Sequence, residues 1–252
     1  MKFYVDTSRY QAWEIYSKEA VSAPVIIRLD GNDFHALTSR CGLYEPFDER
    51  FHSAMVGTVK DLMTETGLQI TLAYTASDEI NVLFLRDAHL PHSGRVEKIL
   101  SLLPSYATSS FQSRLLSFAE FERPISFDAR VVKVNRGEEV VEYFRWRAHA
   151  VFRNFINAYA QRLIGEERCR GMKGNQIVNE LSTLGFNIHE APGWQRYGTM
   201  VYWKIVERAG YNPLTNERVT VKRRKLSVDE IDLTSVEGEK WLRSQIDALY
   251  YG

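Results

Sequence analysis

Two short stretches of the sequence carry acidic residues where a buried strand is expected to end. The segment TLAYTASDEINVLFL, residues 71–85, has two alternating apolar runs that meet at Ser77, Asp78 and Glu79. The segment VIIRLDGNDFH, residues 25–35, places Asp30 directly after an apolar run. A tight turn between strands usually contains Gly or Asn, so two adjacent carboxylates at this position need an explanation.

Carboxylates at two strand ends can bind a metal ion if the fold brings them together. Carboxylates a few ångströms apart repel each other and raise each other's pKa unless a cation lies between them. Mg²⁺ prefers one or two carboxylates, waters and substrate phosphates, and two such ions about 4 Å apart can stabilise a phosphoryl displacement. Our hypothesis is that the turn at Asp78 and Glu79 is acidic because it binds metal together with Asp30. The alternative is that these acids are ordinary turn or helix-cap residues.

The elements around these acids follow from hydrophobic periodicity. The pattern predicts strands at Val25–Leu29, Gln69–Tyr74, Ile80–Leu85 and Ile125–Val134. It predicts helices at Ser8–Glu19, Asp48–Glu65, Arg95–Phe118 (with a kink or break at Pro104) and Glu138–Ile164, where Trp146 is expected in the core.

The order strand, helix, hairpin, helix, strand is that of an α+β, ferredoxin-like (βαββαβ) domain, with an antiparallel sheet backed by two helices. We predict this domain over residues 1–165 and a smaller C-terminal extension of shorter elements over residues 166–252. In such a sheet the end of the first strand lies near the hairpin turn. Asp30 is therefore expected to approach Asp78 and Glu79.

Composition limits the function classes. Formal net charge is zero, yet residues 145–225 hold 15 Lys or Arg against 6 Asp or Glu, which suits either a phosphate-binding face or a solvated surface. No stretch is apolar enough for a membrane span or a signal peptide. Cys41 and Cys169 lie far apart, so we expect no structural zinc or disulfide framework and a cytoplasmic protein.

Several motifs, in order, resemble those of the tRNA(His) guanylyltransferase family. RLDGNDFH resembles the family's R-L-D-G-x-x-F-H signature, ASDEINVLF its S-D-E hairpin, GLYEPFDERF its K-P-x-D-x-R segment and SFDARVV its S-F-D-x-R-V-V strand. YFRWRAHAVFRNFINAY resembles the W-R helix in the form typical of the archaeal and bacterial-like branch, and GWQRYGTMVYW a later strand.

The resemblance implies a polymerase-palm-like fold that adds nucleotides to tRNA 5′ ends in the 3′-to-5′ direction. ATP would activate the 5′-phosphate, and the 3′-OH of GTP would then attack it. Asp30, the Gly31 carbonyl and Asp78 would hold two Mg²⁺ ions, with Glu79 as an accessory catalytic carboxylate. Nucleotide contacts would come from Asp30, Gly31, Asn32, Asp33, Phe34, His35, Ser77 and Asp78. RNA or triphosphate contacts would come from Arg28, Arg50, Arg130, Arg147, Arg153, Asn154, Lys222, Arg223, Arg224 and Lys225.

Some residues depart from the family pattern. Asn32 stands where Arg is frequent, and Glu45 stands where Lys is frequent, with Arg50 as a candidate replacement cation. These departures favour members that repair 5′-truncated tRNAs over dedicated guanylate addition to tRNA(His). We expect a homodimer or homotetramer, as is usual in the family. We assign no role to histidines other than His35, because they have no ligand spacing.

Two other functions remain open on sequence grounds. One is a palm-fold nucleotide cyclase, which the absence of a G-G-D/E-E-F hairpin disfavours. The other is a non-catalytic RNA-binding module, which the loss of Asp30 or Asp78 would favour; both are present.

Overall fold

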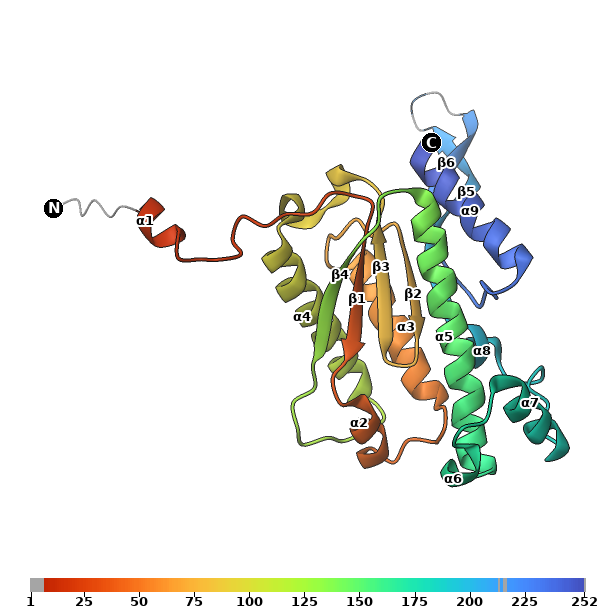
Figure 1. Ribbon diagram of the computed structural model, residues 1–252. Coiled ribbons are helices and arrows are strands. Elements are labelled where there is room, and N and C mark those ends of the chain that lie inside the picture. Colours follow the sequence, from red (N-terminus) through yellow and green to blue (C-terminus); the bar gives the residue numbers. More distant parts are fainter. Residues whose placement is uncertain (1–6, 213, 215–216, 252) are drawn as a thin grey trace.

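The computed structural model describes residues 7–212, 214 and 217–251 as a mixed α/β fold built on one antiparallel sheet (Figure 1). Over these residues, the sheet contains strands β1 (Val25–Gly31), β2 (Leu72–Ala76), β3 (Glu79–Phe84), β4 (Phe127–Lys133), β5 (Thr199–Asn212) and β6 (Glu217–Asp229), in the order β4-β1-β3-β2-β5-β6. The helices are α1 (Thr7–Gln11), α2 (Phe34–Arg40), α3 (Glu49–Thr64), α4 (Val96–Leu115), α5 (Gly137–Leu163), α6 (Glu166–Cys169), α7 (Gly174–Thr183), α8 (Gly193–Tyr197) and α9 (Val236–Tyr251), with 3₁₀ turns at Asp87–His89 and Pro91–Gly94.

The two faces of the sheet are covered by different helices. On β1, Val25, Ile27 and Leu29 are fully buried and share a cluster with apolar side chains of α2, α3 and α4. Ile26 faces the other way and joins a second cluster with side chains of α5 and α9. Because successive side chains of a strand alternate between faces, Asp30 lies on the α5 side of the sheet.

The segment from residue 25 to residue 163 largely follows the sequence-based prediction. Helices α3, α4 and α5 and strands β1, β3 and β4 begin and end within a few residues of the expected positions. α4 is a single helix that continues through Pro104, so the predicted break does not occur there, and the alternative of a kink stays a prediction. The turn between β2 and β3 contains only Ser77 and Asp78; Glu79 is the first residue of β3 rather than part of the turn.

The N-terminal helix is shorter than predicted. α1 ends at Gln11, whereas the sequence pattern predicts a helix to Glu19. No residue of α1 is buried, and this segment lies well away from the sheet (Figure 1). Without an apolar face packed on the body, little beyond intrinsic propensity holds a longer helix together.

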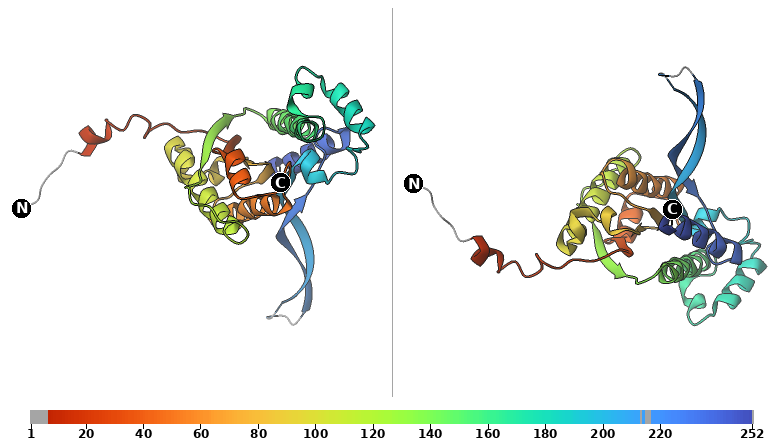
Figure 2. Two further views of the ribbon diagram at one scale, coloured as in Figure 1. Left: turned by 90° about the horizontal axis from the view of Figure 1, so that it is seen from below. Right: turned by 90° about the horizontal axis from the view of Figure 1, so that it is seen from above.

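The C-terminal region differs most from the prediction of short elements. β5 and β6 have 14 and 13 residues and pair with each other along their length. β5 also pairs with β2, with Tyr202 opposite Leu72, so the hairpin extends the main sheet. Its far part projects beyond the body of the molecule (Figure 2). Across the described ranges, no helix combines the length and apolar character that crossing a bilayer requires.

Candidate active site

The acidic strand ends meet as the sequence predicts. β1 and β3 are antiparallel, and their register sets Asp30 opposite Glu79. The Gly31 N–H donates a hydrogen bond to the backbone carbonyl of Asp78 at 3.1 Å. Gly31 itself is fixed by packing, because a Cβ there would lie 2.5 Å from the Phe34 ring. The chain can therefore hold Asp30 and Asp78 at one end of the sheet.

Three carboxylates form a row across neighbouring strands at this end. Asp30 on β1 lies opposite Glu79 on β3 and opposite Asp128 on β4. Like charges directly opposite each other in a sheet are destabilising. Arg130 lies 3.6 Å from Asp128 and 3.9 Å from Asp30, which offsets only part of this repulsion.

Glu79, the predicted accessory carboxylate, is held by protein groups. Arg147 on α5 donates to both of its oxygens, at 2.8 and 2.5 Å, and Asn81 Nδ2 donates at 2.8 Å. Asn81 in turn accepts a hydrogen bond from the Tyr143 hydroxyl at 2.6 Å. Arg28 lies 4.0 Å away. Glu79 is therefore compensated by arginine and joins the sheet to α5. Asp30 has only a long ion pair with Arg130, at 3.9 Å, and no ion pair involves Asp78 among the described residues.

The charges of Asp30 and Asp78 are disfavoured as the site stands. Burial raises the pKa of Asp78 to about 6, and the nearby Asp30 adds to this effect. Burial, followed by repulsion from Glu79, raises the pKa of Asp30. A divalent cation would reverse both effects. The described residues contain no group of three or more His, Cys, Asp or Glu side chains suited to a metal. Two carboxylates with the Gly31 carbonyl are nevertheless a donor set that suits Mg²⁺ completed by phosphate oxygens.

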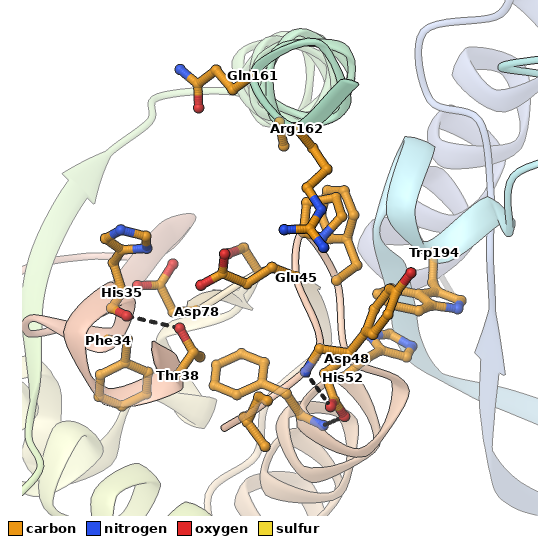
Figure 3. A pocket seen from close by; sticks show the side chains of 17 residues that line it. Phe34, His35, Thr38, Glu45, Asp48, His52, Asp78, Gln161, Arg162 and Trp194 are labelled. Carbon is orange, nitrogen blue, oxygen red and sulfur yellow. Dashed lines mark hydrogen bonds between the residues drawn. The ribbon is translucent and has the colours of Figure 1, made fainter. Parts of the chain in front are cut away.

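A cavity of about 580 Å³ opens beside Asp78 (Figure 3). It lies between α2, the start of α3, the β2–β3 turn, the end of α5 and α8. Its lining consists of Phe34, His35, Thr38, Leu43, Tyr44, Glu45, Pro46, Phe47, Asp48, Phe51, His52, Ser77, Asp78, Ala158, Gln161, Arg162 and Trp194. This volume is in the range of small-molecule and cofactor sites.

One wall of the cavity is aromatic. His52 stacks on Trp194 with ring centroids 4.4 Å apart and planes 9° from parallel. Burial lowers the pKa of His52 to about 4, so the imidazole is neutral at neutral pH. Such a wall suits the flat face of a nucleobase. Sequence reasoning assigned no role to His52, because a stacking partner 142 positions away leaves no local spacing pattern.

Asp48 closes another part of the wall. Its carboxylate caps α3 by accepting from the Arg50 N–H at 2.8 Å, and it accepts from the Tyr44 N–H at 2.9 Å. The Arg50 guanidinium donates to both carboxylate oxygens, at 3.1 and 2.6 Å. These hydrogen bonds hold the pKa of Asp48 well below its usual range. Arg50 is thus engaged by Asp48 and does not line the cavity.

The other predicted contact residues divide into near and distant groups. Phe34, His35 and Ser77 line the cavity with Asp78. Arg153 and Asn154 are exposed on α5 but are not in the lining. The sequence-based assignment of Trp146 to the core is wrong: it is 55% exposed, and the Arg147 guanidinium lies over its ring at 4.7 Å.

The basic residues at positions 222–225 are exposed on β6, in the hairpin that projects from the body (Figure 2). Lys225 lies opposite Lys204 on β5, so the two strands add their positive charges. Arg224 lies over the Trp203 ring at 4.8 Å. The hairpin therefore presents a basic surface separate from the cavity.

Comparisons with known proteins give one consistent result. A family model described as tRNAHis guanylyltransferase matches residues 7–135 of the 252. The tRNA(His) guanylyltransferase of Debaryomyces hansenii is 26% identical over 259 aligned positions, covering 93% of this chain and 96% of the relative.

Solved structures show the same fold. A bacterial tRNA(His) guanylyltransferase-like protein in complex with ATP matches with a TM-score of 0.78 at 23% identity, covering 96% of this chain and 99% of that one. A bacterial protein of the same description in complex with GTP matches with a TM-score of 0.70 at 24% identity, covering 95% and 98%.

Proposed function

The chain belongs to the tRNA(His) guanylyltransferase family of nucleotidyltransferases, and from this premise we propose that it adds nucleotides to tRNA 5′ ends in the 3′-to-5′ direction. The observation that carries the proposal is that Asp78 lines a cavity of nucleotide size and lies close to Asp30, at the adjacent end of β1. ATP first activates the 5′-monophosphate of the tRNA. The 3′-OH of GTP, or of a template-matched nucleotide, then attacks the activated phosphate.

Asp30, the Gly31 carbonyl and Asp78 hold two Mg²⁺ ions in this proposal, with Glu79 as an accessory carboxylate. The raised pKa values of Asp30 and Asp78 support it, because the arginines near Asp30 do not cancel the effects of burial and of the neighbouring carboxylates. When bound, Mg²⁺ would lower the pKa of the attacking 3′-OH and neutralise charge on the leaving group. The contacts of Glu79 with Arg147 and Asn81 favour a supporting role for Glu79 over metal ligation.

The nucleotide occupies the cavity, with its base toward the His52–Trp194 stack and its phosphates toward Asp78. Phe34, His35 and Ser77 line the phosphate end, and the adjacent Asp30, Gly31, Asn32 and Asp33 are proposed contacts from outside the lining. The chemistry of the two ends supports this orientation, since one is aromatic and the other provides metal ligands. The solved bacterial proteins of similar fold are complexes with ATP and with GTP.

We further propose that the catalytic part is a ferredoxin-like, polymerase-palm-like domain over residues 1–165. The strand order β4-β1-β3-β2, with α3 between β1 and β2 and α4 between β3 and β4, supports it. Residues 166–252 form the extension that contacts RNA through the basic surface of the hairpin. Phosphate contacts of this kind give affinity and orientation, with no sequence reading. Arg28, Arg130, Arg153 and Asn154 remain proposed contacts for RNA or triphosphate.

A homodimer or homotetramer is also proposed. The segment that follows α1 supports it, because its apolar side chains Trp13, Ile15 and Tyr16 are 68%, 78% and 66% exposed and could be covered by another subunit. The cytoplasmic location stays a prediction.

Two residues that differ from the family pattern bear on which tRNAs the enzyme uses. Glu45 lines the cavity where the resemblance leads one to expect a Lys, and Asn32 stands where Arg is frequent. We propose that the enzyme repairs 5′-truncated tRNAs by template-dependent addition, with guanylate addition to tRNA(His) as one case.

An addition assay tests the proposal directly. The protein is incubated with ATP, Mg²⁺ and labelled GTP, using tRNA(His) that lacks its first 5′ nucleotide and other tRNAs truncated in the same way. Repair activity predicts label in all substrates whose template base is C. Label in tRNA(His) alone would indicate dedicated guanylylation instead. No label in any substrate, or undiminished label with Asp30→Asn, would contradict the proposed active site.

A further inference from the structure

The cavity beside Asp78 is lined by three acidic residues, whose negative charges would repel the triphosphate of a nucleotide. Glu45, Asp48 and Asp78 all contribute to the wall. Metal ions at the Asp30–Asp78 end would offset Asp78, and Arg50 already offsets Asp48. Glu45 is left with a hydrogen bond from the Ser39 hydroxyl at 3.1 Å, which does not remove its charge. A triphosphate in this cavity therefore needs a cation from the protein.

Most arginines near the site are committed to carboxylates. Arg147 is bound to Glu79 through two hydrogen bonds, and Arg130 lies within 4.0 Å of both Asp30 and Asp128. Neither residue lines the cavity, and nor does Arg50. The wall histidine His52 is neutral because of its burial. These groups cannot supply a free positive charge inside the cavity.

Arg162 is different from all of these. It lies in the last turn of α5 and lines the cavity, and its guanidinium points inward from the wall that faces Glu45 (Figure 3). Among the residues that the structure describes, no hydrogen bond or ion pair engages this guanidinium. The 27-residue helix α5 also carries Arg147, so the backbone at Arg162 is tied to the sheet through the Arg147–Glu79 pair.

We propose that Arg162 binds the triphosphate of the nucleotide substrate and is the protein's own phosphate-binding cation in this cavity. The inference rests on the proposed function, since it takes the occupant of the cavity to be a nucleoside triphosphate. A guanidinium suits the task because its planar array of N–H donors can bind two phosphate oxygens at once. Arg162 on α5 thereby provides the positive charge that the family pattern places at position 45, where this chain has Glu45.

Equilibrium binding without tRNA tests the assignment, because no turnover then occurs. Affinities for GTP and for guanosine are measured in the presence of Mg²⁺, with the full chain as wild type, Arg162→Gln and Arg162→Lys. Arg123→Gln is the matched control, since Arg123 is exposed between α4 and β4 and lies outside the lining. We expect Arg162→Gln to weaken GTP binding by roughly ten- to a hundred-fold and leave guanosine binding unchanged. Arg162→Lys should lie between, because it keeps the charge without the planar array.

The outcomes separate this inference from the proposed function. Wild-type binding of GTP with equal affinity in Arg162→Gln would overturn the role of Arg162 and leave the proposed nucleotide site intact. Equal losses of GTP and guanosine binding would overturn it as well, since the residue would then act on the base or the shape of the cavity. Failure of the wild type to bind GTP at all would overturn both. Unchanged thermal unfolding of Arg162→Gln checks that the variant folds.

Discussion

At the scale of single residues, Asp78 is a proposed metal ligand whose negative charge is destabilised by burial in the metal-free protein. Its raised pKa, about 6, means that above this pH the folded protein holds a charge that the unfolded chain accommodates more easily. We expect Asp78→Asn to increase the free energy of unfolding of the metal-free protein at pH 7.5 by about 1 to 3 kcal/mol. The same variant should lose nucleotide addition.

Urea denaturation with and without Mg²⁺ measures this effect. Mg²⁺ should stabilise the wild type more than Asp78→Asn, because the variant keeps only one of the two proposed carboxylate ligands. A variant that is less stable than the metal-free wild type, or that keeps the full response to Mg²⁺, would argue against metal binding at Asp78.

His52 makes a separate contribution to the dependence of stability on pH. Its folded pKa, about 4, lies below the unfolded value near 6.5, so the unfolded chain binds a proton that the folded chain excludes. The free energy of unfolding therefore has its full value above pH 6.5, and it decreases as pH falls toward 4 because the unfolded chain gains a proton. Between pH 7 and 5 we expect a loss of about 2 kcal/mol from this group.

His52→Phe keeps an aromatic ring against Trp194 and removes the titration. Urea unfolding of both proteins at pH 7 and 5 isolates the histidine, because the carboxylates of the site titrate equally in each. Between pH 7 and 5, the free energy of unfolding of the variant should fall by about 2 kcal/mol less than that of the wild type. Parallel losses in the two proteins would mean that His52 is not buried as a neutral group.

Only part of the site could be predicted from sequence. Asp30 lies in the last two residues of β1 and Asp78 in the turn after β2, and strand pairing makes such positions neighbours, so local patterns were sufficient. Arg162, His52 and Trp194 line one cavity because α3, α5 and α8 lie around it. Nothing in the sequence spacing of these three residues indicates that they share a cavity.

At the scale of elements, the Arg147–Glu79 ion pair fastens α5 to β3. The side chains are 15% and 11% exposed, so removing one leaves the other charged and poorly solvated. We expect Arg147→Ala to reduce the free energy of unfolding by about 3 to 5 kcal/mol. Arg168→Ala is the control, since its pair with Glu180 is 71% and 34% exposed, and should cost about 1 kcal/mol or less.

Chemical denaturation of the single variants and of Arg147→Ala with Glu79→Ala completes this test. The double variant should lose less than the sum of the two single losses, because the second substitution removes a charge already left without its partner. Additive losses would show that the two side chains act independently.

The basic hairpin makes its own prediction about RNA. Reversing the charges of Lys222, Arg223, Arg224 and Lys225 to Glu should weaken tRNA binding. If all four contact phosphates, the slope of log affinity against log salt should fall in magnitude by roughly three. Binding measured over a series of salt concentrations gives the slope. An unchanged slope would remove this surface from the interface, and reversal of Lys60 and Arg123 elsewhere on the molecule serves as the control.

The elements themselves were predictable where burial sets the pattern. β1 alternates between two apolar clusters, and α4 remains helical through Pro104 because Leu103, Ala107 and Phe111 are buried on either side of the proline. In the hairpin, much of β6 is exposed and includes four consecutive basic residues. Its strands are held by pairing with each other, so no alternating apolar face indicates their length.

At the scale of the whole molecule, the sheet joins parts of the chain that the sequence separates. β2 lies between β3 and β5, so strands from both sides of residue 165 are hydrogen-bonded neighbours. Met200 and Tyr202 of β5 and Leu242 and Ile246 of α9 are buried in the same cluster as Tyr74 of β2. The proposed extension therefore contributes to the core of the catalytic half.

This shared core predicts that a fragment ending at residue 165 does not fold cooperatively. Removing β5 and α9 would expose the edge of β2 and the apolar side chains beneath them, which costs about 25 cal/mol for each Å² of apolar surface. We expect the fragment to bind a hydrophobic dye and to unfold without a sharp thermal transition. The full chain should not bind the dye and should unfold in a sharp transition. A matched chain in which only the projecting end, residues 207–222, is replaced by an Asn-Gly turn should keep the transition, since the body of the sheet is intact. Cooperative unfolding of the fragment would instead support an autonomous domain over residues 1–165.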